Sequence, residues 1–317
     1  MLTAFLAVLP VFLLIGAGWM AGRRAWLGPT GSAELNRFVV WLGLPALLFT
    51  VMAEADWAKL WQPGFIAAFA IGGCAVLLGT VAWRLQRGES LADASLNGLN
   101  AASANTGYIG FPIAEAVMGR DSFGLVSITA ILTASAIFSL AIVLLEAGRH
   151  QGAHPVRLAG RVGLSVLRNP IVLAPLLGGL WSSLGIPLPD SVARALHLLG
   201  AAASPCALIA LGLFFAAPRQ ETQSTGLGLP IQLSVIKLVL QPLLTGALVL
   251  WVFRLEPFAA AVAVLMSALP TATGAFMLAD HYRLDAATTS RTILISTALS
   301  IVTLTVLAVL LQALPRG

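Results

Sequence analysis

The residues best suited to chemistry lie in two stretches that interrupt an otherwise apolar chain. The first, NTGYIGFP at residues 105–112, combines an amide, a hydroxyl, two glycines and a proline. The second reads PTATG at residues 270–274. Proline removes a backbone donor and glycine permits unwound conformations, so both stretches predict breaks in helices. Such breaks survive in a membrane only where protein covers them or where they line a cavity.

Broken helices of this kind offer a binding site for an anion. The amides of a new helical turn have no partner within the helix and carry partial positive charge, which stabilises a carboxylate. Our hypothesis is that a carboxylate binds here. Asparagine and threonine side chains would complete its hydrogen bonds, and the candidates are Asn105, Thr106, Thr271 and Thr273.

Two ionisable residues lie near these stretches or within the same apolar runs. Lys237 is the single charge between residues 222 and 253, and an ionisable residue inside a membrane is a functional candidate by default. It could pair with the anion directly, or with Glu115, which follows Pro112 by three positions. Glu115 could instead carry protons in a desolvated setting, or remain a hydrated carboxylate near the interface.

Other titratable groups favour structural roles. The cluster at the end of the second interrupted segment is typical of a solvated helix end, although His281 could make ligand exit sensitive to pH; its members are Asp280, His281, Arg283 and Asp285. Cys74 and Cys206 lie in apolar runs and are read as small buried hydrophobes. No arrangement indicates a metal site or a cofactor.

The composition identifies the surroundings of these residues as a membrane. Of the 317 residues 58% are hydrophobic and only 10% are charged, whereas a soluble domain has about a quarter charged residues. We expect an all-α integral membrane protein surrounded by lipid, which excludes a cytosolic enzyme and a nucleic-acid binder. Ten runs with few or no charges are expected to span the membrane: 1–22, 38–53, 60–83, 94–114, 122–145, 169–189, 195–218, 222–253, 257–279 and 292–315.

The boundaries of two of these runs need comment. The N-terminal run is followed, not preceded, by a basic pair, so it is expected to be a retained first span and not a cleaved leader. The run at 38–53 is short and is expected to extend back through Glu34 and Arg37, whose long side chains can reach the interface.

Basic residues predict the orientation. With ten spans, one side of the membrane would hold Arg23, Arg24, Arg37, Arg84, Arg87, Arg149, Arg157, Arg161, Arg168, Arg219, Arg283 and Arg291. The other side would hold Lys59, Arg120, Arg194, Arg254 and Arg316. Because basic loops stay in the cytoplasm, we expect both termini outside the cytoplasm and the basic linker at 148–164 inside.

The linker separates two halves of five expected spans each, residues 1–147 and 165–317. An odd number of spans per half makes the halves enter from opposite faces, as in an inverted repeat. Prolines support the pairing: Pro10 and Pro170, Pro29 and Pro189, and Pro45 and Pro205 are each 160 positions apart, and Pro112 and Pro270 are 158 apart. The fourth span therefore matches the ninth. Matching breaks in two inverted halves are typical of a transporter substrate site.

Five segments carry a resemblance to a known family. They are NTGYIGFPIAEAVMG, LRNPIVLAPLLGGL, AAASPCALIALGLFF, IKLVLQPLL and ALPTATGAFMLADHY. In this order they resemble short bacterial members of the auxin efflux carrier family over nearly the whole chain. The resemblance implies ten helices in two inverted five-helix repeats, with broken helices four and nine crossing.

The resemblance also implies a mechanism and residue roles. Helices 1, 2, 6 and 7 would form a scaffold, helices 3–5 and 8–10 would form a moving transport domain, and the protein would be a homodimer. Asn105, Thr106 and Gly107 match the substrate-contacting element, and Pro112 and Pro270 match the crossover prolines. Many members carry an asparagine shortly after the second proline, where this chain has Thr273, whose hydroxyl cannot make the paired contacts of an amide.

The sequence therefore predicts a secondary transporter of small mono- or dicarboxylates in the cytoplasmic membrane, with no ATP-binding loop and no enzyme activity. A sodium- or proton-coupled transporter of the bile-acid and cation-antiporter superfamily is the alternative, although the crossover offers only Glu115 as a carboxylate. A ligand-binding membrane sensor is the alternative from another class. An intramembrane hydrolase is disfavoured because no histidine or aspartate lies near the breaks to activate a serine.

Overall fold

The regular elements of the protein are all helices in the part of the chain that the computed structural model describes, residues 2–28, 30–54, 61–149, 170–216 and 226–312. No strand is present in these ranges. The expected basic linker at 148–164 lies outside the described residues from position 150 on. Five short stretches are π-helical and are named η1, η2, η4, η5 and η6; η3 is a 3-10 turn.

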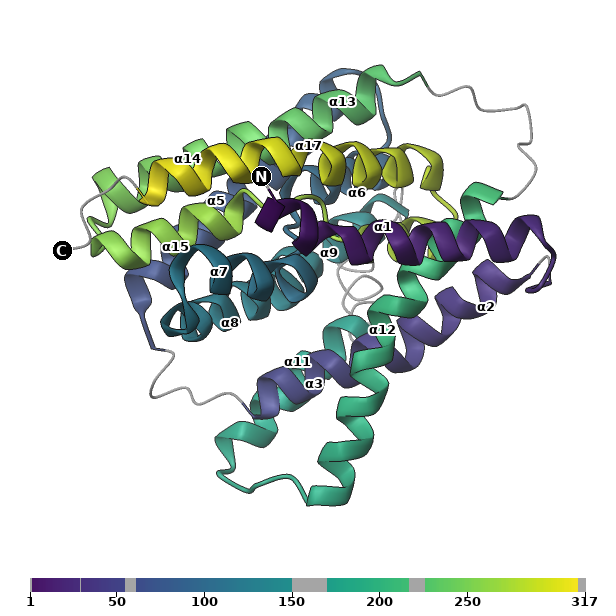
Figure 1. Cartoon of the computed structure of the whole chain (residues 1–317), viewed down its shortest axis with the longest axis horizontal. Coiled ribbons are helices and arrows are strands. Elements are labelled where there is room, and N and C mark those ends of the chain that lie inside the picture. Colours follow the sequence, from purple (N-terminus) through teal and green to yellow (C-terminus); the bar gives the residue numbers. More distant parts are fainter. Residues whose placement is uncertain (1, 29, 55–60, 150–169, 217–225, 313–317) are drawn as a thin grey trace.

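Five helices and one π turn lie together on one side of the molecule (Figure 1). We call them the first helix group: α1 (Leu2–Arg23), α2 (Gly31–Phe38), η1 (Val39–Gly43), α3 (Leu44–Ala53), α11 (Pro170–Ser183) and α12 (Asp190–Ala216). In this group α12 packs along α1 and α2, and α11 packs along α3.

Glycines permit this close packing. A Cβ atom at Gly18 of α1 would overlap the carbonyl of Ile209 on α12, and one at Gly212 of α12 would overlap the carbonyl of Ile15 on α1. Small residues let membrane helices approach backbone to backbone, where dispersion contacts hold them together. The first helix group is therefore a tightly packed body.

The remaining elements form the second helix group. They are α5 (Pro63–Gln86), α6 (Leu91–Ala102), η2 (Thr106–Gly110), α7 (Phe111–Met118), η3 (Arg120–Ser122), α8 (Phe123–Ile131), η4 (Leu132–Ile137), α9 (Phe138–Arg149), α13 (Gly228–Val235), η5 (Ile236–Leu240), α14 (Gln241–Ala247), η6 (Leu248–Val252), α15 (Pro257–Ser267), α16 (Gly274–His281) and α17 (Ala286–Gln312). Here α5 packs on α6, α6 on α9, α13 on α17 and α14 on α15.

Six helices of the described chain are long and apolar enough to cross a membrane: Gly31–Ala53, Pro63–Gln86, Arg120–Arg149, Asp190–Ala216, Gly228–Val252 and Ala286–Leu311. Each corresponds to one expected span. The expectation that the second span extends back through Glu34 and Arg37 is confirmed, because its helix begins at Gly31. The full count of ten spans stays a prediction.

The expected fourth span is broken as its sequence predicts. Helix α6 starts at a capping residue, Ser90, whose hydroxyl accepts the amide of Asp93 at 3.1 Å, and it ends at Ala102. Ser103 is extended, with φ −78° and ψ 114°. A new helical segment begins at Thr106 and continues through η2 and α7, with Pro112 as the second residue of α7, where a missing donor costs little.

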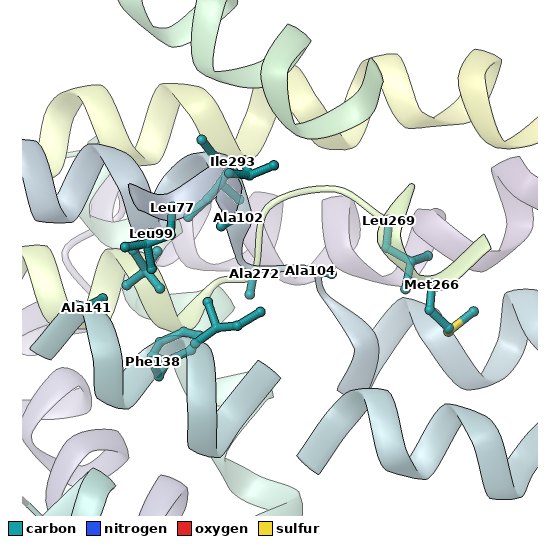
Figure 2. Close-up of a cluster of buried hydrophobic side chains, with 14 of the residues drawn as sticks. Leu77, Leu99, Ala102, Ala104, Phe138, Ala141, Met266, Leu269, Ala272 and Ile293 are labelled. Atoms are coloured by element: carbon teal, nitrogen blue, oxygen red, sulfur yellow. The ribbon is translucent and has the colours of Figure 1, made fainter. Parts of the chain in front are cut away.

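The expected ninth span is broken in the same way. Helix α15 ends at Ser267, and α16 begins at Gly274 after Thr273. Figure 2 shows Ala104 and Ala272 where the two non-helical stretches pass each other. Leu99 and Ala141 lie to one side of them and Leu269 to the other (Figure 2), so the crossing is embedded in the hydrophobic core.

Candidate functional site

The two interrupted stretches meet through their backbones. The amide of Asn105 donates to the carbonyl of Pro270 at 2.9 Å, and the amide of Ala272 donates to the carbonyl of Ser103 at 3.0 Å. Ala104 and Thr271 thus form an isolated antiparallel bridge. Each stretch satisfies backbone groups that the other leaves without a helical partner, as buried backbone requires.

Buried side chains support the crossing through hydrogen bonds to its backbone and to the end of α6. The Thr271 hydroxyl donates to the carbonyl of Asn100 at 2.8 Å, and the amide of Thr271 donates to the hydroxyl of Ser296 at 3.2 Å. Gln241 donates through Nε2 to the carbonyl of Ala102 at 2.9 Å. The carbonyls of the last turn of α6, which a helix leaves unpaired, are therefore capped by side chains.

Lys237 has a similar supporting position. Its side chain is fully buried, and Nζ donates to the carbonyl of Ser267 at 2.6 Å. Ser267 ends α15, so the amino group lies at the negative end of that helix dipole. The sequence left two roles open for Lys237, a pair with the bound anion and a pair with Glu115. Lys237 makes no ion pair with any described residue. Glu115 is half exposed and bonds Arg120 at 2.7 Å. The Lys237 to Glu115 pair is not formed.

In front of the crossing lies a cavity of about 380 Å³ between the two helix groups. The first group contributes Leu44, Leu47, Leu48, Val51, Gly200 and Ala201, and the second contributes Ala104, Asn105, Thr106, Gly107, Phe111, Ser127, Ala130, Thr133, Ala134, Phe138, Ala272, Thr273 and Gly274. None of these residues is charged. The lining is apolar on the side of α3 and polar at the crossing.

The predicted site residues divide between the cavity and its support. Asn105, Thr106, Gly107 and Thr273 line the cavity. The side-chain amide of Asn105 makes no hydrogen bond within the described residues, although only 4% of the residue is exposed. An amide in such surroundings is available to a ligand.

The other predicted residues lie elsewhere. Pro270 and Thr271 are buried and form the crossing itself, so they position the lining residues. Pro112 lies in the first turn of α7, and its side chain is outside the described part of the chain. Glu115 is half exposed at the protein surface, where it bonds Arg120, and it does not line the cavity.

Sequence reasoning missed the contribution of the helix formed by α8, η4 and α9. Ser127, Ala130, Thr133 and Phe138 of this helix all line the cavity. They recur at helical spacing and form a face of mostly small or hydroxyl-bearing side chains, which was the available signal. The apolar wall from α3 was also missed.

The cavity resembles an anion site in its electrostatics. Gly107 and Gly274 lie in the first turns of the helical segments that begin at Thr106 and Gly274, and both line the cavity. First-turn amides lack intrahelical acceptors and carry partial positive charge. In the described chain no group of three or more histidines, cysteines or carboxylates is placed to hold a metal ion.

Contacts of α16 with α2 and η1 help to join the two helix groups. Asn36 of α2 donates from Nδ2 to Oδ2 of Asp280 on α16, and Trp41 packs edge to face with His281 at 6.4 Å. A smaller cavity of about 70 Å³ near Glu54 and His197 shares Leu47, Val51 and Gly200 with the main one. It extends the main cavity toward the end of α3.

The sequence matches the family described as "Membrane transport protein" over residues 3–308. It is 29% identical over 309 residues to a "Putative malonate transporter" of Rhizobium meliloti, covering 96% of this chain and 95% of that protein. It is 22% identical over 334 residues to auxin efflux carrier component 8 of Arabidopsis thaliana, covering 88% and 89% of the two chains. A transporter of Methanothermobacter thermautotrophicus is 28% identical over 313 residues.

Proposed function

Because the chain belongs to the membrane transport protein family, which includes auxin efflux carriers, we propose that it is a secondary transporter of small organic anions in the cytoplasmic membrane. The substrate binds at the crossing of the two interrupted helices. The observation that carries this proposal is the cavity of about 380 Å³ that Asn105, Thr106, Thr273 and the first-turn glycines line.

The substrate class follows from the lining. A carboxylate receives hydrogen bonds from the amides of Gly107 and Gly274, from the Asn105 amide and from the Thr273 hydroxyl. Burying a second, unpaired carboxylate in an uncharged cavity is costly. Lys237 supplies one buried amino group behind the crossing, held by the carbonyl of Ser267. The cavity therefore fits one carboxylate best, with the apolar part of the substrate against Leu47 and Leu48.

Alternating access would come from movement between the two helix groups. The first helix group corresponds to the expected scaffold helices 1, 2, 6 and 7, and the second corresponds to the expected transport domain, helices 3–5 and 8–10. The cavity lies between them, so a sliding of the second group would carry the substrate past the wall formed by α3. The proposal keeps the division of the chain into two repeats, residues 1–147 and 165–317.

The proposal includes an orientation and an assembly. With both termini outside the cytoplasm, the end of α3 faces outward and the Asn36 to Asp280 contact faces the cytoplasm. The structure is then an outward-facing state, closed on the cytoplasmic side. A homodimer through the first helix group agrees with the proposed fixed role of that group.

Flux measurement tests the function and separates it from ligand sensing. Proteoliposomes that contain the purified protein are loaded in turn with malonate, malate, succinate, lactate, pyruvate or indole-3-acetate. Exchange of the labelled acid is then measured with and without sodium at two pH values. The proposal predicts exchange of at least one acid. Binding without exchange would favour a sensor, and dependence of flux on sodium or pH would identify coupling.

A further inference from the structure

One hydroxyl in the cavity differs from its neighbours on the same helix. Ser127 donates to the carbonyl of Phe123 at 2.8 Å, Thr129 to that of Val126 at 2.8 Å, and Ser135 to that of Ile131 at 2.5 Å. Returning the hydroxyl to a carbonyl one turn back is the ordinary way for serine and threonine to be satisfied inside a helix.

Thr133 lacks such a bond. Its Oγ1 is buried and has no hydrogen-bond partner in the described chain, only 3% of the residue is exposed, and the residue lines the cavity. A buried hydroxyl without a partner is unfavourable unless something in the cavity binds it. No acceptor in the described chain holds the hydroxyl, so a rotation about χ1 can turn it toward an occupant of the cavity.

The backbone at Thr133 is also unusual. Thr133 lies in the π turn η4, and its carbonyl accepts the amide of Phe138, five residues further on. Single π turns inside α-helices are rare and occur frequently at functional sites. The turn lies on the stretch of helix that faces the cavity.

Two contacts place Thr133 against the crossing. At one end of the helix, the ring of Phe123 packs edge to face on Phe111 of α7, with 5.4 Å between ring centroids. Near the middle of the helix, Phe138 lies so close to Gly274 of α16 that a Cβ there would be 2.9 Å from its ring. Thr133 lies between these contacts, about 7 Å along the helix axis from Phe138.

We propose that the Thr133 hydroxyl donates a hydrogen bond to the bound organic anion. The helix formed by α8, η4 and α9 is then the third side of the substrate site, beside the two interrupted segments. A neutral hydroxyl donor suits a carboxylate oxygen and adds no charge to the cavity. The inference rests on the proposed function, since it takes the anion as the occupant of the cavity.

Matched variants test the role. Thr133→Val keeps the shape and removes the hydroxyl, Thr133→Ser keeps the hydroxyl, and Thr129→Val removes a neighbouring buried hydroxyl that already has an acceptor. Affinity is measured by thermal shift with whichever acid of the six-member panel wild type exchanges. Loss of one hydrogen bond predicts an apparent Kd raised about five-fold or more in Thr133→Val. Thr133→Ser and Thr129→Val should stay within about two-fold of wild type.

A second measurement, the melting temperature without ligand, shows whether the variant is folded. Without ligand, Thr133→Val should melt at or above the wild-type temperature, because it removes an unpaired buried polar atom. Unchanged affinity in Thr133→Val, while wild type binds and exchanges the acid, would overturn the role of Thr133 and leave the proposed function standing. If wild type neither binds nor exchanges any acid of the panel, the proposed function and this inference both fall.

Discussion

The amide of Asn105 donates a 2.9 Å hydrogen bond to the carbonyl of Pro270, although the two residues are in different halves of the chain. This bond fixes the first interrupted segment against the second, and it leaves the Asn105 side chain lining the cavity beside Thr273.

The number of ionised carboxylates on an acid should determine whether it binds. No described residue that lines the cavity is charged, so a second carboxylate has no partner there. Succinate and its monomethyl ester have similar shapes and differ by one charge. We expect the monoester to compete with the transported acid at least about ten-fold better, which corresponds to a difference of about 1.4 kcal/mol in binding free energy. Equal or stronger competition by succinate would show that the site neutralises two charges.

Replacing Gly274 by alanine should disturb the crossing. The added Cβ would lie 2.9 Å from the ring of Phe138, and overpacking of this kind costs about 1–3 kcal/mol. We expect a lower melting temperature and weaker uptake for Gly274→Ala. Gly79→Ala in α5 is the control, because nothing lies within 4 Å of its added Cβ. Wild-type behaviour of Gly274→Ala would contradict the tight contact.

Lys237 should contribute to affinity through its charge. Lys237→Met removes the buried amino group and its bond to Ser267, whereas Gln241→Met, one helical turn away, removes a neutral cap of α6. Anion affinity should fall about ten-fold or more in Lys237→Met, since a bound anion and the protonated form of a nearby amine stabilise each other, and less in Gln241→Met. Titration calorimetry measures both. Equal losses in the two variants would indicate a purely structural role for Lys237.

The contact between Asn36 and Asp280 should break during transport, because it joins the two helix groups. Cysteines at both positions, in a background with Cys74 and Cys206 replaced by alanine, can be cross-linked by mercuric ion. We expect uptake to stop on cross-linking and to return on adding excess thiol. A pair at Ser32 and Ala210, which contact each other within the first group, is the control and should not stop uptake when cross-linked. Continued uptake with the first pair linked would contradict movement between the groups.

The sequence predicted the breaks because proline, glycine and polar side chains coincide at residues 105–112 and 270–274. Their effects on the backbone are local, and local effects can be read from one segment. The helix class and the six long spans were likewise predictable from apolar runs.

The hydrogen-bond and ion-pair partners of individual side chains were harder to predict from the sequence. Glu115 bonds Arg120 because Gly119, with φ 84°, ends α7 and turns the chain back; a spacing of five on a straight helix would not suggest the pair. The bond of Lys237 to a carbonyl depends on where α15 ends. Thr133 resembles any threonine in an apolar helix until the π turn and the cavity are seen.

The most direct measurement of the central claim is ligand-induced thermal stabilisation of wild type, Asn105→Ala and Asn97→Ala by the acid that wild type exchanges. Asn97 is a buried asparagine of α6 whose amide bonds Glu89 at 3.0 Å and which does not line the cavity. A ligand that binds only the folded protein raises its melting temperature. We predict stabilisation of wild type and Asn97→Ala that is lost in Asn105→Ala. Full stabilisation of Asn105→Ala would place the anion away from the crossing and contradict the account.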